Sequence, residues 1–180
     1  MKMKEKIKQE AASLFAEHGY AGTSLAQISE RVGIKKPSLY AHYKSKDHLF
    51  EVLAEEAFEA EQQRIATTED LYELLSSMLH LYEQDARFRF LVTSSFFSPD
   101  FLKKEIMAQY DVLLQSLEGK IYGFERIPDD QKEDAAVMYT LIFDSIAVEL
   151  CYGTKKRSEK RLDTAWRVFT HYFLKEQEKK

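Results

Sequence analysis

The sequence predicts an all-α protein, and three observations carry that prediction. Glycine and proline together make up 9 of the 180 residues, far below the roughly 12% of average proteins, so turns are few and helices are long. Apolar residues recur at helical spacing along most of the chain, and no segment alternates apolar and polar residues as a half-buried strand does. A hydrophobic fraction of 44% with a net charge of −4 supplies enough apolar surface for a folded core.

The first predicted helix occupies the Lys-rich start of the chain. Ile7, Ala11 and Leu14 recur three and four positions apart and so share one face of a helix. Gly19 follows this stripe and is typical of a helix C-terminus. We therefore expect one amphipathic helix that ends at this glycine.

Two short helices follow, separated by a tight turn. Ser24 and Gln27 have the spacing of a capping box, which predicts a second helix that Gly33 ends. Pro37 is tolerated only in the first turn of a helix, so a third helix begins just before it and runs to Tyr43. Three short helices with a turn of a few residues match a helix-turn-helix, whose second member enters the DNA major groove.

The sequence predicts longer helices in the rest of the chain. Ser45 is a candidate N-cap for a fourth helix that reaches Ile65. The segment GFERIPDD is the clearest loop of the second half, and the helix after it is apolar nearly all round, which requires burial on more than one side. The later helices are expected near residues 69–84, 86–97, 99–118 and 133–151, with a final aromatic stripe over 162–173.

The residues from Gly19 to Phe50, GYAGTSLAQISERVGIKKPSLYAHYKSKDHLF, resemble the N-terminal signature of TetR/AcrR-type transcriptional regulators. Three positions depart from the usual pattern, namely Ser29 for alanine, Lys35 for a serine cap and Tyr43 for phenylalanine. The matching positions are Gly19-Tyr20, Thr23-Ser24, Gly33-Ile34, Ser38-Leu39-Tyr40, His42-Tyr43 and Ser45-Lys46.

The resemblance implies a helix-turn-helix DNA-binding domain over residues 1–45 and a helical effector-binding and dimerisation domain over 46–180. It also implies a ligand-responsive regulator, a repressor, that binds a palindromic double-stranded operator as a homodimer and is released by a small lipophilic effector. The charge distribution agrees, because residues 1–50 carry +4 and residues 51–180 carry −8. A basic module on an acidic body is typical of DNA-binding proteins.

The expected DNA contacts lie around the second and third helices. The hydroxyl of Ser24 can bind a phosphate at a helix N-terminus. Cations at a helix start oppose the helix dipole, so a lysine pair there favours an external anion. Pro37 and Ser38 are compact and can approach base edges. The resemblance implies that Tyr40, His42 and Lys46 contact the DNA backbone. The predicted set is Ser24, Lys35, Lys36, Pro37, Ser38, Tyr40, His42 and Lys46, whereas Leu39 and Tyr43 are expected to pack inward.

Two further sets follow from the aromatic residues of the second half. A two-fold dimer would supply the second recognition helix that one weakly binding helix needs, and residues 133–151 with the final stripe are the candidate interface. The interface candidates are Ile142, Ile146, Trp166, Phe169 and Phe173. The resemblance implies that other aromatic residues line an effector pocket, and the candidates are Phe96, Phe97, Tyr110, Tyr139 and Phe143. The alternative for both the interface set and the pocket set is that these residues only form the internal core.

Enzyme, metal and membrane functions are not expected. Cys151 is the single cysteine, the five histidines form no metal-binding pair four residues apart, and no glycine-rich phosphate loop is present. No stretch is expected to reach the ~18 to 20 apolar residues of a membrane span. The sequence thus predicts a cytoplasmic protein without cofactor or metal, and leaves one alternative, a helical protein-interaction module that does not bind DNA.

Overall fold

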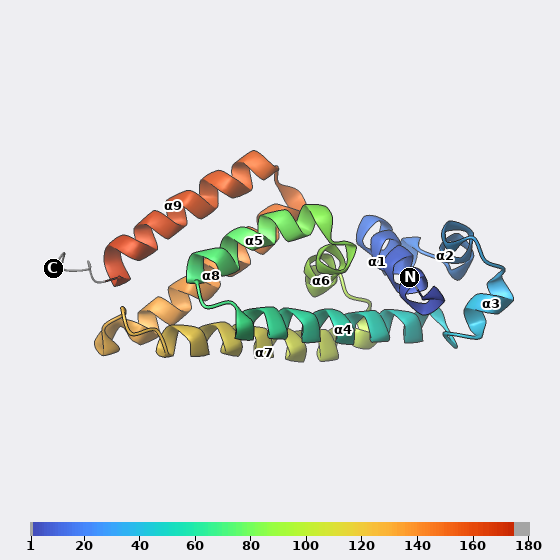
Figure 1. Cartoon of the computed structure of the whole chain (residues 1–180), viewed down its shortest axis with the longest axis horizontal. Coiled ribbons are helices and arrows are strands. Elements are labelled where there is room, and N and C mark those ends of the chain that lie inside the picture. Colours follow the sequence, from blue (N-terminus) through green and yellow to red (C-terminus); the bar gives the residue numbers. More distant parts are fainter. Residues whose placement is uncertain (1, 175–180) are drawn as a thin grey trace. The chain divides into compact units, whose positions relative to one another are not determined.

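The computed structural model describes residues 2–174, and within them it contains α-helices and two 3-10 turns but no strand (Figure 1). The all-α prediction is therefore confirmed. In chain order the elements are α1 (Met3–Gly22), α2 (Leu25–Val32), α3 (Lys36–Tyr40), α4 (Lys46–Thr67), α5 (Leu71–Gln84), α6 (Ala86–Phe96), η1 (Asp100–Leu102), α7 (Lys103–Tyr122), η2 (Asp129–Gln131), α8 (Lys132–Tyr152) and α9 (Lys155–Phe173).

The helix boundaries follow the capping signals of the sequence. Ser24 is the N-cap of α2, and the capping box with Gln27 is complete. Gly33 adopts the left-handed conformation at φ 78°, which favours glycine. Gly19 has φ 69° and interrupts the helical backbone of α1, so the regular part of that helix ends where the sequence predicts.

Two boundaries differ from the predictions. α3 ends at Tyr40 rather than Tyr43, because the amide of His42 bonds the carbonyl of Leu39 and tightens the last turn. The helix expected over 99–118 begins as the 3-10 turn η1 and continues as α7 to Tyr122. Pro99 has an extended conformation and stands before the turn instead of opening the α-helix.

The chain divides into two compact units. The first runs up to Glu61 and includes Leu81–Tyr110. Within it, α1 packs against α6. The rings of Phe15, Phe50 and Phe90 form its aromatic centre, with centroid distances of 5.0 Å from Phe50 to each of the other two rings.

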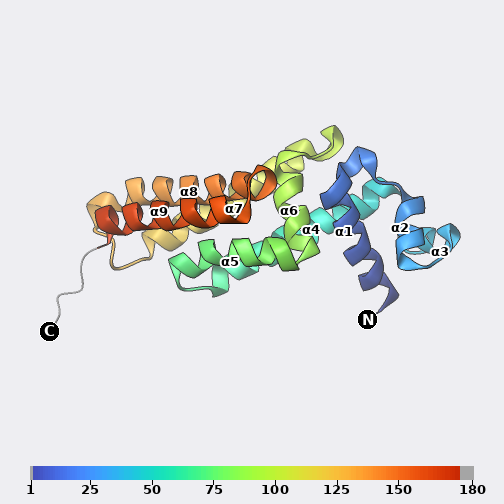
Figure 2. The same ribbon diagram turned by 90° about the horizontal axis from the view of Figure 1, so that it is seen from above.

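The second unit comprises Gln62–His80 and the chain from Asp111 onward. α8 and α9 lie side by side in it (Figure 2). Tyr139 of α8 is fully buried, and its hydroxyl donates a 2.7 Å hydrogen bond to the carbonyl of Leu71. Its ring meets Phe169 of α9 at 5.8 Å, so the two helices share one core.

α8 tests the prediction that no segment is apolar enough to span a membrane. With the turn before it, the segment Asp129–Tyr152 contains an 18-residue stretch with a mean hydropathy of 1.5, so by length and composition alone it could cross a membrane. Asp144 and Glu149 interrupt the apolar residues of α8, as expected from the sequence. Half of that 18-residue stretch is buried within the protein, and Glu149 is buried and paired with Arg157, as is typical of a core helix.

Candidate nucleic-acid interface

The turn between α2 and α3 is held by local backbone and side-chain bonds. The amide of Ile34 donates to the carbonyl of Ser29 at 2.9 Å, and Gly33 supplies the left-handed residue that this geometry needs. Lys6 of α1 reaches the C-terminal carbonyl of α2, with its ammonium 2.8 Å from the oxygen of Val32. That contact was not predicted, since nothing in the local sequence links Lys6 to a carbonyl twenty-six residues away.

α3 is anchored by a single residue. Leu39 is fully buried and is the only buried member of this helix. The backbone before it, at Lys35, is extended and offers no side-chain cap. Tyr43, just after α3, is also buried, so both residues expected to pack inward do so.

The remaining side chains around α3 form an exposed row. Tyr40 is 47% exposed, and the ammonium of Lys36 lies 5.9 Å from the centre of its ring. Neither Lys35 nor Lys36 has an ion pair among the residues that the structure describes. We name these residues the α3 surface, which consists of Lys35, Lys36, Pro37, Ser38, Tyr40 and His42, all exposed.

Ser24, the N-cap of α2, is exposed, but its hydroxyl and its amide already have partners. Its hydroxyl donates to the side-chain oxygen of Gln27 at 2.7 Å, and its amide donates to the same oxygen at 2.8 Å. A phosphate at this helix N-terminus would therefore have to replace the Gln27 side chain.

Lys46 is placed differently from the other predicted contacts. Its ammonium donates to the carbonyls of Tyr20 and Thr23, at 2.8 and 3.0 Å, and lies 3.9 Å from the centre of the Tyr20 ring. An ammonium has three N–H donors, so one remains for another acceptor. Lys46 thus ties the start of α4 to the end of α1, a role the sequence reading missed.

Tyr20 is the centre of that junction. Its hydroxyl donates to the carboxylate of Asp47, and its ring packs edge-on against Phe50 at 5.4 Å and Phe101 at 5.3 Å. Burial and the neighbouring Asp47 carboxylate raise the pKa of Tyr20 to about 12. The phenol therefore stays protonated at neutral pH and keeps α1 and α4 in a fixed relation.

Three charged side chains link α1 to α4. The ammonium of Lys8 is nearly buried, 2.7 Å from a carboxylate oxygen of Glu5 and 2.8 Å from one of Glu56. Burial opposes its charge, but the bonds from both carboxylates outweigh it and raise the pKa of Lys8. Tyr43 follows α3 by three residues, and its buried hydroxyl has no hydrogen-bond partner among the residues described.

The five predicted pocket aromatics divide between the two units. Phe96, Phe97 and Tyr110 belong to the first unit, where Phe96 and Phe97 are exposed, whereas Tyr139 and Phe143 lie in the core of the second unit. The structure does contain a hollow of about 210 Å³ in the first unit, between α4 and the start of α7, and no residue of the predicted set lines it. Its lining consists of Glu51, Ala54, Glu55, Phe58, Leu102, Glu105, Ile106 and Gln109.

The predicted interface residues divide by burial. Ile142, Ile146 and Phe169 are buried inside the chain, and Trp166 and Phe173 are half-buried. The first three pack in their own core and cannot face a partner, which corrects their assignment. The exposed apolar residues of α8 and α9 are instead Val137, Met138, Leu141, Val148, Tyr152, Val168 and Tyr172. Among the residues described, no group of three or more His, Cys, Asp or Glu is arranged to hold a metal ion.

Sequence comparisons agree with this geometry. Residues 7–53 match the family model described as bacterial regulatory proteins, tetR family. The biofilm operon icaADBC HTH-type negative transcriptional regulator IcaR of Staphylococcus aureus (strain Newman) is 29% identical over 163 residues, which cover 85% of this chain and 87% of that protein. IcaR of Staphylococcus epidermidis is 48% identical over 56 residues, covering 31% of this chain and 30% of that protein.

Solved structures share the fold along nearly the whole chain. The TetR family protein CprB from S. coelicolor A3(2) superposes with a TM-score of 0.77 at 20% identity, over 97% of this chain and 90% of its own. AibR, solved in complex with isovaleryl coenzyme A and operator DNA, has a TM-score of 0.65 at 17% identity, over 96% of this chain and 98% of its own. The helix-turn-helix geometry and the family match together show that residues 7–53 carry the DNA-binding domain of the bacterial tetR regulatory family, and the rest of the chain is similar to TetR-family proteins in fold.

Proposed function

We propose that this regulator is a cytoplasmic repressor that binds a palindromic operator as a homodimer and is released by a small molecule. The observation that carries the proposal is the α3 surface, where Lys36 and Tyr40 are exposed around the buried anchor Leu39. The IcaR relatives are named negative regulators, which supports repression. In this proposal residues 1–45 read DNA, and residues 46–180 bind the effector and the second copy.

The chemistry of α3 suits the major groove. Pro37 and Ser38 are compact and exposed, so the helix can approach base edges closely. Lys36, Tyr40 and His42 surround them with hydrogen-bond donors for phosphates. One good bidentate base contact is worth only about 1–3 kcal/mol, and a helix of this length makes few. Two copies of α3 on a two-fold operator provide the missing affinity.

The second copy binds through the open faces of α8 and α9. Val137, Leu141 and Val148 of α8 are exposed aliphatic residues, and Tyr172 of α9 is 69% exposed. Contiguous exposed apolar residues are typical of a protein interface. These residues replace Ile142, Ile146 and Phe169 in the interface that we propose.

The effector acts through α4. The hollow beside α4 has an apolar floor that includes Phe58 and Ile106, which suits a lipophilic group. Its volume of about 210 Å³ is enough for a group of about the size of a benzene ring, so a much larger ligand must part α4 from the start of α7. Lys46, at the N-terminus of α4, would transmit that shift to α1. A 100-fold loss of operator affinity needs only ~2.7 kcal/mol of coupling.

DNA binding is tested by fluorescence anisotropy with the duplex upstream of the chain's own reading frame. The double variant Lys36→Ala, Tyr40→Ala should lose at least tenfold in affinity, since it removes two donors in each of two half-sites, each worth ~0.5–1.5 kcal/mol. Lys104→Ala, an exposed lysine of α7, is the matched control and should leave affinity unchanged.

Two outcomes would contradict the proposal. Unchanged affinity in the double variant would reject the α3 surface as the reading surface. A dimer with no salt-sensitive DNA binding at all would favour the alternative, a helical protein-interaction module. Effector response is tested separately, because a lipophilic ligand that binds the native state must raise the melting temperature and lower operator affinity in the same titration.

A further inference from the structure

The open face of α8 is an apolar stripe that the half-buried Asp144 and Ser145 interrupt. Val137, Leu141, Val148 and Tyr152 follow one another at intervals of four, seven and four residues, which places them on one side of the helix. Leu141 is 54% exposed and lies at the middle of the aliphatic part. The opposite side of α8 is filled by the core of the second unit, so this stripe is the side left for another molecule.

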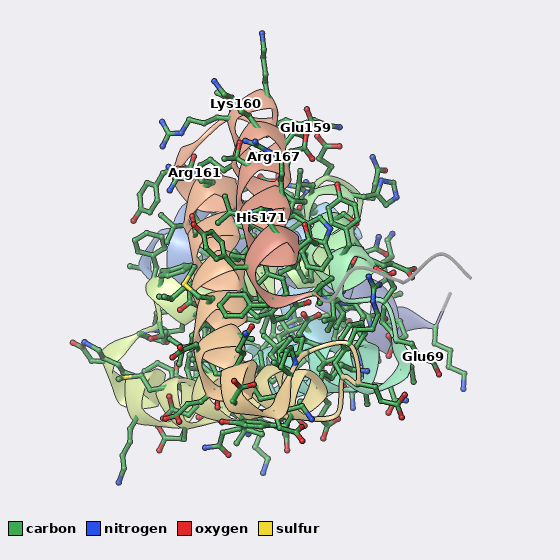
Figure 3. The ribbon with its side chains drawn as sticks, turned by 90° about the vertical axis from the view of Figure 1, so that its left-hand side faces the viewer. Glu69, Glu159, Lys160, Arg161, Arg167 and His171 are labelled. Carbon is green, nitrogen blue, oxygen red and sulfur yellow. The ribbon has the colours of Figure 1, made fainter. Side chains whose placement is uncertain are left out.

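The stripe carries opposite charges at its two ends. Asp134 lies on the same side of α8, seven residues before Leu141, and is exposed in the first helical turn. At the other end Arg161 of α9 donates to the hydroxyl of Ser145 at 3.1 Å and lies 3.2 Å from a carboxylate oxygen of Glu149. Figure 3 shows Arg161 extending from α9 toward α8.

Arg161 brings positive charge to the stripe. Glu149 is 4% exposed as a side chain and is already held by Arg157, at 2.5 and 2.8 Å. Two guanidinium groups therefore face one buried carboxylate, and the side chain of Arg161 is still 53% exposed. Glu149, Arg157 and Arg161 together leave one positive charge at the C-terminal end of the stripe, where the nearby Asp144 has a partner of its own, whereas the N-terminal end has the negative charge of Asp134.

A second copy of the chain is the partner that this pattern fits. If two stripes paired in parallel about a two-fold axis, each end would meet its own like charge. An antiparallel pairing places the acidic end of each copy against the basic end of the other. With the axis at Leu141, position 134 of one copy lies opposite position 148 of the other, the level at which Arg161 bonds Ser145 and Glu149.

We propose that Asp134 of each copy pairs with Arg161 of the other, and that this reciprocal contact selects an antiparallel register centred on Leu141. The inference rests on the proposed homodimer and adds to it the pair that determines register and choice of partner. Charge pairs at the rim of an interface contribute chiefly to specificity in this way. Here each substitution acts twice, because a two-fold interface repeats every contact.

The test measures the dimer dissociation constant by sedimentation velocity for four variants. Asp134→Lys should raise it about tenfold, because two like-charge contacts replace two ion pairs. Glu133→Lys is the matched control: it makes the same charge change in the same helical turn but on the flank of the stripe, so it should stay within about twofold of the original protein.

The decisive variant restores the charge pair by exchange. Val148→Glu places a carboxylate opposite position 134 and should weaken the dimer alone. Asp134→Lys combined with Val148→Glu should recover most of the loss, because each new lysine meets a new glutamate across the axis. High salt should reduce the defect of Asp134→Lys. Circular dichroism checks that each variant keeps its helical content.

The outcomes separate this inference from the proposed dimer. A dimeric parent protein with equal effects of Asp134→Lys and Glu133→Lys, or with additive losses in the double variant, would overturn the pairing and leave the dimer standing. A parent protein that remains monomeric at the concentrations used for operator binding would overturn both.

Discussion

The buried hydroxyl of Tyr43 predicts a substitution that stabilises the protein. Tyr43 is 1% exposed, and its hydroxyl has no partner within the part of the chain that the structure describes. Burying an unpaired hydroxyl costs about 1–3 kcal/mol. Tyr43→Phe removes that hydroxyl and keeps the ring, so it should raise the free energy of unfolding by about 1 kcal/mol, or the melting temperature by roughly 2–4 °C.

The chain offers a matched control for the same chemical change. Tyr139 is also fully buried, but its hydroxyl donates a 2.7 Å bond to Leu71. Tyr139→Phe should therefore lower the free energy of unfolding by about 1 kcal/mol. Urea denaturation followed by circular dichroism measures both variants. The fluorescence of Trp166, the single tryptophan, reports separately on the unit that contains Tyr139.

Opposite signs for the two substitutions are the expected result. Loss of stability in Tyr43→Phe would refute the reasoning, because it would mean that the hydroxyl has a favourable partner in the native state. Since the hydroxyl of Tyr43 does not reach the α3 surface, operator affinity should be the same before and after the change.

Three further predictions follow from contacts described above. Lys46→Ala should weaken operator binding without changing its salt dependence, since the ammonium of Lys46 binds backbone carbonyls of its own chain. Lys36→Ala should instead reduce the slope of log K against log salt by about 0.9 per lost phosphate contact. Equal slope changes in the two variants, measured by anisotropy, would contradict this. Hydrogen bonds from a guanidinium keep the pKa of Glu149 below its ordinary value of 4.5, so its stabilising effect is complete above pH 4.5 and is lost as pH falls through the lowered pKa. Glu149→Gln should accordingly flatten the acid limb of stability in urea titrations, and an unchanged limb would refute it. Gly33→Ala should lower the free energy of unfolding by roughly 1–2 kcal/mol because of its φ of 78° alone, since a Cβ there meets no atom within 4 Å. A Cβ at the helical Gly119 also meets no atom within 4 Å, so Gly119→Ala should instead raise the free energy of unfolding. Thermal melts measure both variants.

Local signals predicted most of the helix boundaries. The capping box of Ser24, the left-handed Gly33 and the N-cap at Ser45 depend on residues at most three positions apart, and all three are present. The start of α7 could not be placed this way. Pro99 fits the first turn of a helix as well as the residue before a 3-10 turn, and only the packing of η1 distinguishes them.

Side-chain direction was harder to predict than helix position. α8 is apolar on both sides, so its sequence predicts two buried faces and does not show which faces its own core. Burial resolves this, because Ile142 and Ile146 pack inside while Leu141 and Val148 stay exposed. Lys46 illustrates the same limit: a lysine beside a DNA-binding helix suggests a phosphate, yet its carbonyl partners lie more than twenty residues away in α1.

The small buried part of α3 has a consequence for how the proposed regulator can change. Leu39 is the only buried residue within the helix, the buried Tyr43 follows it, and the six residues of the α3 surface are exposed. Apart from Pro37, which belongs to the first turn of the helix, mutations at those positions should therefore disturb little packing, so that a lineage can drift toward new operators by single amino-acid replacements. Randomised libraries over the same positions should remain folded in most members, provided that Leu39 is retained.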